Sequence, residues 1–427
     1  MDTPLPDYLT EVLDTCGGDD GGELAAYIPE LAEADPDRLA LALCMLDGVV
    51  YAVGDTDARF SIQSISKPFA YALALADHGL DAVVEKVGVE PSGEAFNEIS
   101  LEVGSGRPFN PMINAGAITV HSLLDDERVR AGFSAFAGRD LEVDEEILGS
   151  ELETADRNYA IAYMLRNHGV IDADPRAAVA GYVRQCSYLV GVEDLAVMAA
   201  TLANGGVQPV TGERVVERWV ARQALSVMTT CGMYDAAGDW FTSVGIPAKS
   251  GVSGGLIGAL PGKGGFSAFS PRLDGHGNSV RGVQVFERLS SDMGMHVLET
   301  PPPARPPLRE HASVPQACAL DGTQEGSLYE IQGSVDFVAM EQLLRELDRD
   351  PPPEVGNVVL DLTHVHEVRD VGRRMLLEGA RRLDLDGHHV SFVDPEGMLR
   401  AFSDDDPDGD GTIDVGDGTE VPVVRSR

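Results

Sequence analysis

Two short segments of the sequence carry residues that can activate a serine hydroxyl. The first is Ser64-Ile65-Ser66-Lys67. On one helical turn, residues three apart share a face, so the Lys67 amine can reach the Ser64 hydroxyl. A serine needs an adjacent base to act as a nucleophile, and burial lowers the pKa of a lysine toward the working range. By itself the pattern is also that of a capping serine and a surface lysine, but the chain has only four lysines.

The second segment is Lys249-Ser250-Gly251, followed by Val252-Ser253-Gly254-Gly255. A Lys-Ser-Gly triplet on a strand edge, downstream of a Ser-x-x-Lys pattern, is the pairing used by serine β-lactamases and penicillin-binding proteins. Glycines let the backbone approach a bound carbonyl, and the N–H groups there can form an oxyanion hole. The alternative is a plain glycine-rich turn.

Five polar residues in apolar surroundings form a third candidate set: Asn114, Glu151, Asn158, Tyr182 and Tyr234. Glu151 and Asn158 are seven residues apart, so on one helix they share a face. A free amino acid needs a carboxylate for its α-ammonium and neutral donors for its α-carboxylate, and these residue types suit that. Each residue alone is more typical of a cap, a surface glutamate or a core tyrosine than of a functional group.

The elements that must position these residues predict an α/β or α+β domain. Two apolar runs around an Asp-Gly turn indicate a hairpin at 39–53. Helices are expected at 64–78, 151–167 and 192–203, strands at 246–255 and 264–269, and a strand or helix at 282–286.

The proline-rich segment 299–315 predicts an extended linker between a first domain, 1–298, and a second, 316–427. The second domain predicts a small α/β sandwich because strands alternate with helices. We expect strands at 327–332, 358–362 and 389–393, and helices at 335–347 and 372–383.

The net charge of −38 argues against nucleic-acid and anionic-membrane partners. An acidic surface with 28 arginines and four lysines indicates tolerance of high salt or, equally, a genome biased toward those codons. Five scattered cysteines predict reduced thiols in a cytoplasmic protein. The sequence has no apolar stretch of about eighteen residues and no secretory signal at its N-terminus.

Taken together, these segments resemble the glutaminase family of bacteria and mitochondria, whose catalytic domain is similar to serine β-lactamases. The resemblance covers nearly all of residues 22–288. It is carried by segments in the family's order, chiefly YIPELAEADPDRLALAL (27–43), FSIQSISKPFAYALAL (60–75), PFNPMINAGAI (108–118), SELETADRNYAIAY (150–163), TCGMYDAAGDW (230–240) and IPAKSGVSGG (246–255).

The resemblance implies hydrolysis of L-glutamine through a glutamyl-serine intermediate, with no cofactor or metal in this domain, in a homodimer or homotetramer. It implies that Ser64 is the nucleophile, Lys67 its base, and the N–H groups of Ser64 and Val252 the oxyanion hole. Tyr234 would shuttle the proton, although either Tyr234 or Lys67 can deliver the proton that the departing ammonia takes up. Lys249 would support the site. The implied substrate pocket comprises Tyr27, Ser64, Asn114, Glu151, Asn158, Tyr182, Tyr234 and Val252.

The second domain more weakly resembles a STAS domain, through NVVLDLTHVHEVRDVGRRML (357–376). Val371 stands at the position of the family's phosphorylated serine or threonine and has no hydroxyl. A phosphorylation switch is therefore not expected, and a packing, oligomerising or sensing role remains open.

An acidic loop near the C-terminus fits the spacing of an EF-hand calcium site, although no clear exiting helix follows it. The candidate ligands are Asp406, Asp408, Asp410, Asp414 and Asp417. A solvated acidic loop is the alternative.

Two other functions fit parts of the sequence. The Ser64–Lys67 pair alone also suits a β-lactamase-like or esterase-like hydrolase of another acyl donor. The second alternative is a regulatory protein whose hydrolase domain is inactive. The intact Ser64, Lys67 and Val252 motifs argue against this alternative.

Overall fold

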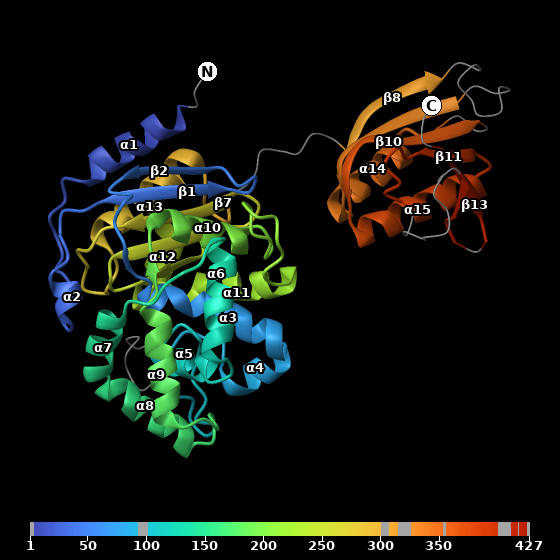
Figure 1. Ribbon diagram of the computed structural model, residues 1–427. Coiled ribbons are helices and arrows are strands. Elements are labelled where there is room, and N and C mark those ends of the chain that lie inside the picture. Colours follow the sequence, from blue (N-terminus) through green and yellow to red (C-terminus); the bar gives the residue numbers. More distant parts are fainter. Residues whose placement is uncertain are drawn as a thin grey trace. The chain divides into compact units, whose positions relative to one another are not determined.

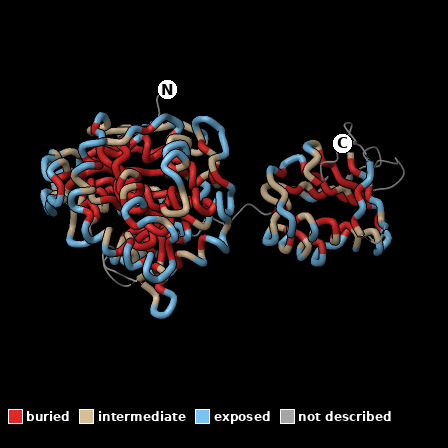
Figure 2. Tube along the Cα trace, turned by 60° about the horizontal axis from the view of Figure 1, so that its bottom comes forward, coloured by how far each residue is buried: buried red, intermediate tan, exposed pale blue. Residues whose placement is uncertain are grey.

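The computed structural model describes residues 4–92, 101–299, 307–314, 326–352, 356–399, 411–416 and 418–424 (Figure 1). The chain divides into two compact units, Met1–Glu299 and Thr300–Arg427. Buried residues gather in the interior of each unit (Figure 2). Among the described residues, no helix is long and apolar enough to cross a membrane.

The first unit is built on an antiparallel sheet with the strand order β2-β1-β7-β6-β5. The strands are β1 (Ala40–Met45), β2 (Val50–Gly54), β5 (Ala248–Ser250), β6 (Gly255–Leu260) and β7 (Gly264–Phe269), and a separate short pair is β3 (Phe60–Ser61) with β4 (Leu189–Val190). The expected hairpin is confirmed as β1 and β2. Its turn contains Gly48 at a φ of 86°, where a Cβ would lie 2.6 Å from the Pro209 carbonyl oxygen.

Helices cover both faces of this sheet (Figure 1). Because strand side chains alternate, Ala40 and Ala42 of β1 pack in the cluster that contains α10, whereas Leu41 and Leu43 pack in the one that contains α1 and α13. The helices of the unit are α1 (Leu5–Cys16), α2 (Pro29–Ala32), α3 (Ser66–His78), α4 (Leu80–Lys86), α5 (Asn114–His121), α6 (Asp126–Ala137), α7 (Glu145–Glu153), α8 (Asp156–Asn167), α9 (Pro175–Cys186), α10 (Val192–Ala203), α11 (Arg218–Cys231), α12 (Ala237–Ser243) and α13 (Val280–Met293).

Two predicted elements differ in detail from the structure. The helix expected from residue 64 begins as a 3₁₀ turn, Gln63–Ile65, before α3. The strand expected at 246–255 is β5 followed by a turn and the first residue of β6. The run at 282–286, expected as a strand or a helix, lies inside the helix α13. The expected helix at 192–203 and the expected strand at 264–269 are confirmed as α10 and β7.

The single helix predicted at 151–167 is wrong, because the chain breaks between α7 and α8. The Thr154 hydroxyl donates to the carbonyl oxygens of Ser150 and Glu151, at 3.1 and 3.3 Å. Glu151 and Asn158 therefore lie on different helices and not on one face of a single helix.

The second unit has a mixed sheet in the order β12-β13-β11-β10-β9-β8. Its elements are β8 (Leu308–Val314), β9 (Gly326–Val335), α14 (Phe337–Arg349), β10 (Asn357–Val368), α15 (Asp370–Leu385), β11 (His389–Val393), β12 (Gly411–Asp414) and β13 (Glu420–Val424). The predicted alternation of strands and helices is confirmed, with β10 parallel to both β9 and β11. Part of the segment predicted as linker instead forms β8, which pairs with β9.

Candidate active site

Ser64 lies in a tight turn that the fold holds in an uncommon backbone conformation. Gln63, its neighbour, has a φ of 48°, in the left-handed region that non-glycine residues rarely adopt. Such strain persists only where the surroundings enforce it, and it clusters at functional sites. Ser64 is buried, and so is Lys67 at the start of α3.

The ammonium group of Lys67 faces neutral oxygen acceptors. Its Nζ donates to the backbone oxygen of Met112 at 3.1 Å and to Oδ1 of Asn114 at 2.8 Å. Burial lowers the pKa of Lys67 to about 8, because the charged form loses hydration. An amine with this pKa exists in both protonation states near neutral pH and can take up or release a proton there.

Tyr234 connects the serine turn to the strand β5. It lies in the bend between α11 and α12, at a φ of 56°, and its hydroxyl donates to the Ser250 carbonyl oxygen at 3.0 Å. Burial raises the pKa of Tyr234, whereas a hydrogen bond with Ser64 acts in the opposite direction. A neutral Tyr234 hydroxyl therefore contacts both the Ser64 side chain and the backbone of the Lys-Ser-Gly strand.

Lys249 packs against the same tyrosine. Its Nζ lies 4.0 Å from the centroid of the Tyr234 ring and donates to the Ser250 carbonyl oxygen at 2.7 Å. Burial, and secondarily the charge on Lys67, hold the pKa of Lys249 well below its usual range. The aliphatic stem and amine of Lys249 thus fix the position of the Tyr234 ring from within the core.

The Gly251–Gly255 turn fits closely against the turn that carries Ser64. A Cβ on Gly255 would lie 2.8 Å from Ile65, and one on Gly251 would lie 3.1 Å from the same side chain. Gly254, at a φ of 95°, allows the chain to return into β6. Val252, which lies between Gly251 and Gly254 in this turn, is half-buried and packs with Ile28, Leu31 and Ile147. The glycines therefore bring the segment of Val252 next to the turn of Ser64.

Glu151, at the end of α7, accepts two hydrogen bonds on one carboxylate oxygen. Tyr27 Oη donates to Oε1 at 2.8 Å, and Gln63 Nε2 donates to the same atom at 2.9 Å. Burial raises the pKa of Glu151, and these two hydrogen bonds oppose that effect. Because Gln63 precedes Ser64, this bond ties the carboxylate directly to the serine turn.

Asn114 is the centre of the remaining polar contacts. Its Oδ1 accepts from Lys67 and, at 3.3 Å, from the hydroxyl of Tyr182 on α9. Its Nδ2 donates to Oδ1 of Asn158 on α8, at 3.1 Å. The break between α7 and α8 therefore does not separate Asn158 from the site, because Asn114 at the start of α5 connects it to Lys67.

Two groups near Lys67 are not predicted from the sequence. Gln63 carries no periodicity or motif signal, because a left-handed backbone at an ordinary residue cannot be read from its neighbours. Cys186, at the end of α9, is buried and lies 4.0 Å from the Ser66 hydroxyl. Burial raises the pKa of its thiol to about 11, so it stays protonated in the working range.

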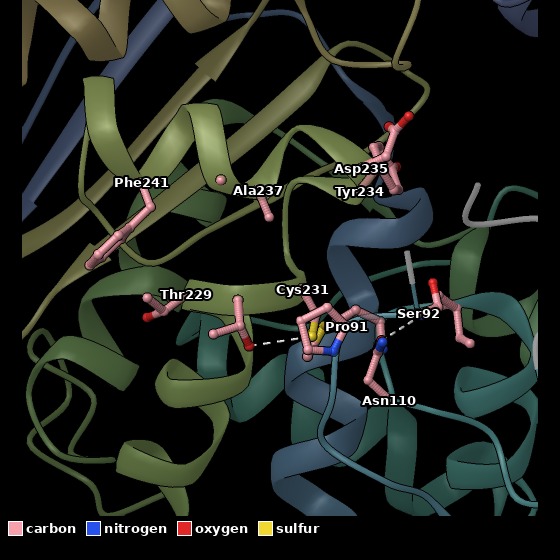
Figure 3. A pocket seen from close by; sticks show the side chains of 13 residues that line it. Pro91, Ser92, Asn110, Thr229, Cys231, Tyr234, Asp235, Ala237 and Phe241 are labelled. Carbon is pink, nitrogen blue, oxygen red and sulfur yellow. Dashed lines mark hydrogen bonds between the residues drawn. The ribbon is translucent and has the colours of Figure 1, made fainter. Parts of the chain in front are cut away.

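A pocket of about 570 Å³ opens beside Tyr234 (Figure 3). The wall is mostly apolar, with Met112, Ile113 and Phe241, and Asn110 and Thr229 add polar groups. Met112 belongs to both the pocket and the site, because its carbonyl oxygen accepts from Lys67. Ser64 and Glu151 are not among the lining residues, so this cavity adjoins the cluster rather than enclosing it.

The described residues contain no group of three or more His, Cys, Asp or Glu side chains arranged to hold a metal ion. Of the candidate calcium ligands, Asp414 lies in β12, and Asp406, Asp408, Asp410 and Asp417 lie outside the described residues. The calcium hypothesis therefore stays a prediction.

The family model for glutaminase matches residues 22–298. That span contains the whole polar cluster around Ser64, Lys67 and Glu151. The chain belongs to the glutaminase family, whose members are hydrolases that act on glutamine.

Individual relatives extend the similarity over the second unit. The chain is 47% identical over 431 residues to a glutaminase of Corynebacterium efficiens, covering 99% of this chain and 97% of the relative. It is 48% identical to a glutaminase of Corynebacterium glutamicum, covering 93% and 96%. The crystal structure of Mglu matches with a TM-score of 0.83 and 48% identity over 93% of this chain and 99% of that one.

A smaller structural relative aligns with only part of the chain. The probable glutaminase from Bacillus subtilis, solved in complex with 6-diazo-5-oxo-L-norleucine, has a TM-score of 0.64 and 31% identity. The match covers 70% of this chain and 98% of that one. A related glutaminase structure therefore exists at a length well short of this chain's 427 residues.

Proposed function

We propose that the protein hydrolyses L-glutamine to L-glutamate and ammonia through a glutamyl ester on Ser64. The observation that carries this proposal is that a buried serine, a lysine of lowered pKa and a carboxylate meet at one turn of the chain. Lys67 follows Ser64 by three residues and is held by Asn114, and Glu151 accepts from Gln63 next to Ser64. Names of relatives over almost the whole chain support the same substrate.

Lys67 is the base in this mechanism. With a pKa of about 8, a substantial fraction of its amine is neutral near physiological pH and can accept the Ser64 proton. Tyr234 has a raised pKa and keeps its proton, so it acts as a relay beside Ser64 rather than as the resting base. The oxygen of Ser64 then attacks the carbon of the γ-carboxamide.

Two polar groups recognise the two ends of the amino acid. Oε1 of Glu151 already accepts from Tyr27 and Gln63, so Oε2 is the acceptor for the substrate α-ammonium. Oδ1 of Asn158 accepts a hydrogen bond from Asn114, so the Nδ2–H groups of Asn158 donate to the substrate α-carboxylate. Tyr182 holds Asn114 in the orientation that this pairing needs.

The tetrahedral oxyanion is stabilised by the backbone N–H groups of Ser64 and Val252. The close fit of Gly251 and Gly255 against Ile65 supports this pairing, because it joins the two segments that carry the donors. Removing one such donor typically costs ~100- to 1,000-fold in rate.

Collapse of the oxyanion breaks the carbon–nitrogen bond, and the leaving nitrogen takes a proton from Tyr234, which Lys67 restores. Water then attacks the ester carbonyl and gives its proton to Lys67. The carbon–oxygen bond to Ser64 breaks, and Ser64 regains its proton. One glutamine and one water are consumed, and one glutamate and one ammonia are formed.

Ammonia release from L-glutamine by the full chain and by Ser64→Ala tests the proposal. We expect release by the parent protein and none above background by the variant, with an unchanged circular dichroism spectrum. Unchanged release by the variant would refute Ser64 as the nucleophile. Turnover of the β-lactam nitrocefin without ammonia release would instead favour the alternative of a β-lactamase-like hydrolase.

A further inference from the structure

A histidine that the proposed mechanism does not use lies buried near the start of α3. His121 is the last residue of α5 and is 4% exposed. Its Nδ1 donates to Oε1 of Gln185 at 2.9 Å, because an amide oxygen can only accept. Its Nε2 faces a carboxylate oxygen of Asp126, on α6, at 3.6 Å. The ring is therefore held at both nitrogens, between an exposed carboxylate and a buried amide.

The helix α9 makes room for this ring with a glycine. A Cβ on Gly181 would lie 2.1 Å from Nε2 of His121 and 3.1 Å from Oδ1 of Asp126. A glycine inside a helix is less favourable than an alanine. The chain therefore has a weaker helix former at the one point where a side chain would displace the histidine.

The amide of Gln185 extends the contact to the segment between Ser64 and Lys67. Its Nε2 donates to the Ser66 hydroxyl at 3.0 Å. Ser66 is fully buried, and its oxygen lies 4.0 Å from the sulfur of Cys186. Because the Ser66 oxygen accepts from Gln185, its own proton can be donated to the thiol.

The thiol of Cys186 completes a path to the candidate active site. It is hydrogen-bonded to Tyr182, one turn earlier on α9. The Tyr182 hydroxyl donates to Oδ1 of Asn114, the same oxygen that accepts from Lys67. Each hydroxyl or thiol on this path can accept from the group before it and donate to the group after it. One direction of hydrogen bonding therefore runs from His121 to Asn114.

This direction decides which end of the Asn114 amide faces Lys67. A proton donated by Tyr182 requires the amide oxygen at that position, and Nδ2 is then left to donate to Asn158. A flipped amide would place its N–H groups against the Tyr182 proton and the Lys67 ammonium. Hydrogen bonds in a chain polarise one another, so the direction of the first bonds favours the same direction in the last.

We propose that His121 and Gln185 are positioning residues for the reaction, which set the direction of this hydrogen-bond chain. They thereby keep the Asn114 oxygen on Lys67. The inference rests on the proposed function, because that function gives Lys67 its role as the base. A hydrogen bond to the ammonium form favours that form. If the direction is lost and the amide N–H groups face the ammonium, the pKa of Lys67 therefore falls.

The pH profile of kcat/KM reports the protonation of Lys67 and tests the inference. The substrate is glutaramate, which has no α-amino group to titrate. Gln185→Met removes both hydrogen bonds of the amide at similar volume. We expect its plateau to fall about tenfold and its midpoint to move about one pH unit below the parent's. His121→Leu should act alike, whereas His121→Asn, whose amide N–H can replace Nδ1–H, should keep the parent's midpoint.

The sign of the shift separates positioning from loosened packing. Water admitted to the core would restore the hydration of the Lys67 ammonium and raise the midpoint. Gln185→Met leaves in place the titratable groups around Lys67, which are His121 on α5, Tyr182 and Cys186 on α9, Tyr234, and Lys249 on β5. A midpoint equal to or above the parent's in Gln185→Met would overturn the inference.

Gln208→Met is the matched control. Gln208 is a fully buried glutamine whose Oε1 accepts from the backbone N–H groups of Val210 and Thr211, outside the chain that leads to Lys67. We expect a lower melting temperature in this variant and the parent's midpoint. An equal downward shift in the control would also contradict the inference. A parent that releases no ammonia would refute the proposed function as well, whereas an active parent with an unshifted Gln185→Met would refute the positioning role alone.

Discussion

Lys67 Nζ donates to Oδ1 of Asn114 at 2.8 Å, which links a lysine at the start of α3 to the first residue of α5. The bond joins the groups proposed for proton transfer to those proposed for substrate binding. It also gives the buried amine a polar partner that carries no charge. The lysine is therefore held in place without a carboxylate that would raise its pKa.

The pH dependence of catalysis follows from the lowered pKa of Lys67. Its neutral form is the base, so kcat/KM should rise with pH and level off above about 8. A profile with glutaramate, which lacks the α-amino group of glutamine, avoids titration of the substrate itself. Tyr234→Phe should lower the plateau and keep the midpoint. A profile that falls through pH 8 as pH rises would contradict the assignment.

The same pKa predicts a pH-dependent difference in stability between the parent and Lys67→Met. Between about pH 8 and 10.5 the unfolded chain binds the proton that the folded chain has lost, so the parent gains stability as pH rises. Over this window the difference in unfolding free energy should change by about 3 kcal/mol in favour of the parent. Urea unfolding at several pH values measures it, and a constant difference would show that Lys67 titrates normally.

Glu151→Gln tests recognition of the α-ammonium. Losing the charge should reduce kcat/KM for L-glutamine by roughly 100-fold or more. With glutaramate, which has no ammonium, the parent and the variant should react at similar rates. An equal loss for both substrates would mean that Glu151 supports the fold rather than the substrate.

Gln63 is predicted to position Glu151. Gln63→Gly and Gln63→Ala both remove the donor to Oε1, so both should raise KM about tenfold with a smaller change in kcat. Because φ is 48° at this residue, the alanine variant should also be less stable than the glycine variant, by ~1 kcal/mol. Thermal unfolding and steady-state kinetics separate the two effects. Unchanged KM in both variants would remove Gln63 from the site.

Much of the fold could be predicted from residue patterns, because hairpins and buried helices leave local signals. The Asp-Gly turn marks β1 and β2, and the apolar run before Asn204-Gly205-Gly206 marks α10. The break at Thr154 could not be predicted, because no glycine or proline marks it in the sequence. The edge strands β8 and β12 lie in proline-rich and acidic segments whose composition favours other structures.

For the candidate site, the residue types were predictable but the contacts were not. Ser64, Lys67 and Lys249 stand in recognisable motifs. Asn114, Glu151, Tyr182 and Tyr234 stand out as polar residues in apolar surroundings, and Tyr27 enters only through the family resemblance. The bonds of Asn114 to residues on α3, α8 and α9 depend on tertiary packing of helices distant in sequence. Gln63 has no motif of its own and is identified only by its backbone angle and its bond to Glu151.

The central claim is that the glutamyl group of glutamine becomes covalently attached to Ser64. Peptide mass spectrometry of the full chain after reaction with 6-diazo-5-oxo-L-norleucine, a glutamine analogue, tests this most directly. We predict one adduct, on the peptide at Ser64, whose formation excess L-glutamine slows and Ser64→Ala abolishes. An adduct elsewhere, such as at Cys186, together with ammonia release by Ser64→Ala, would contradict the account.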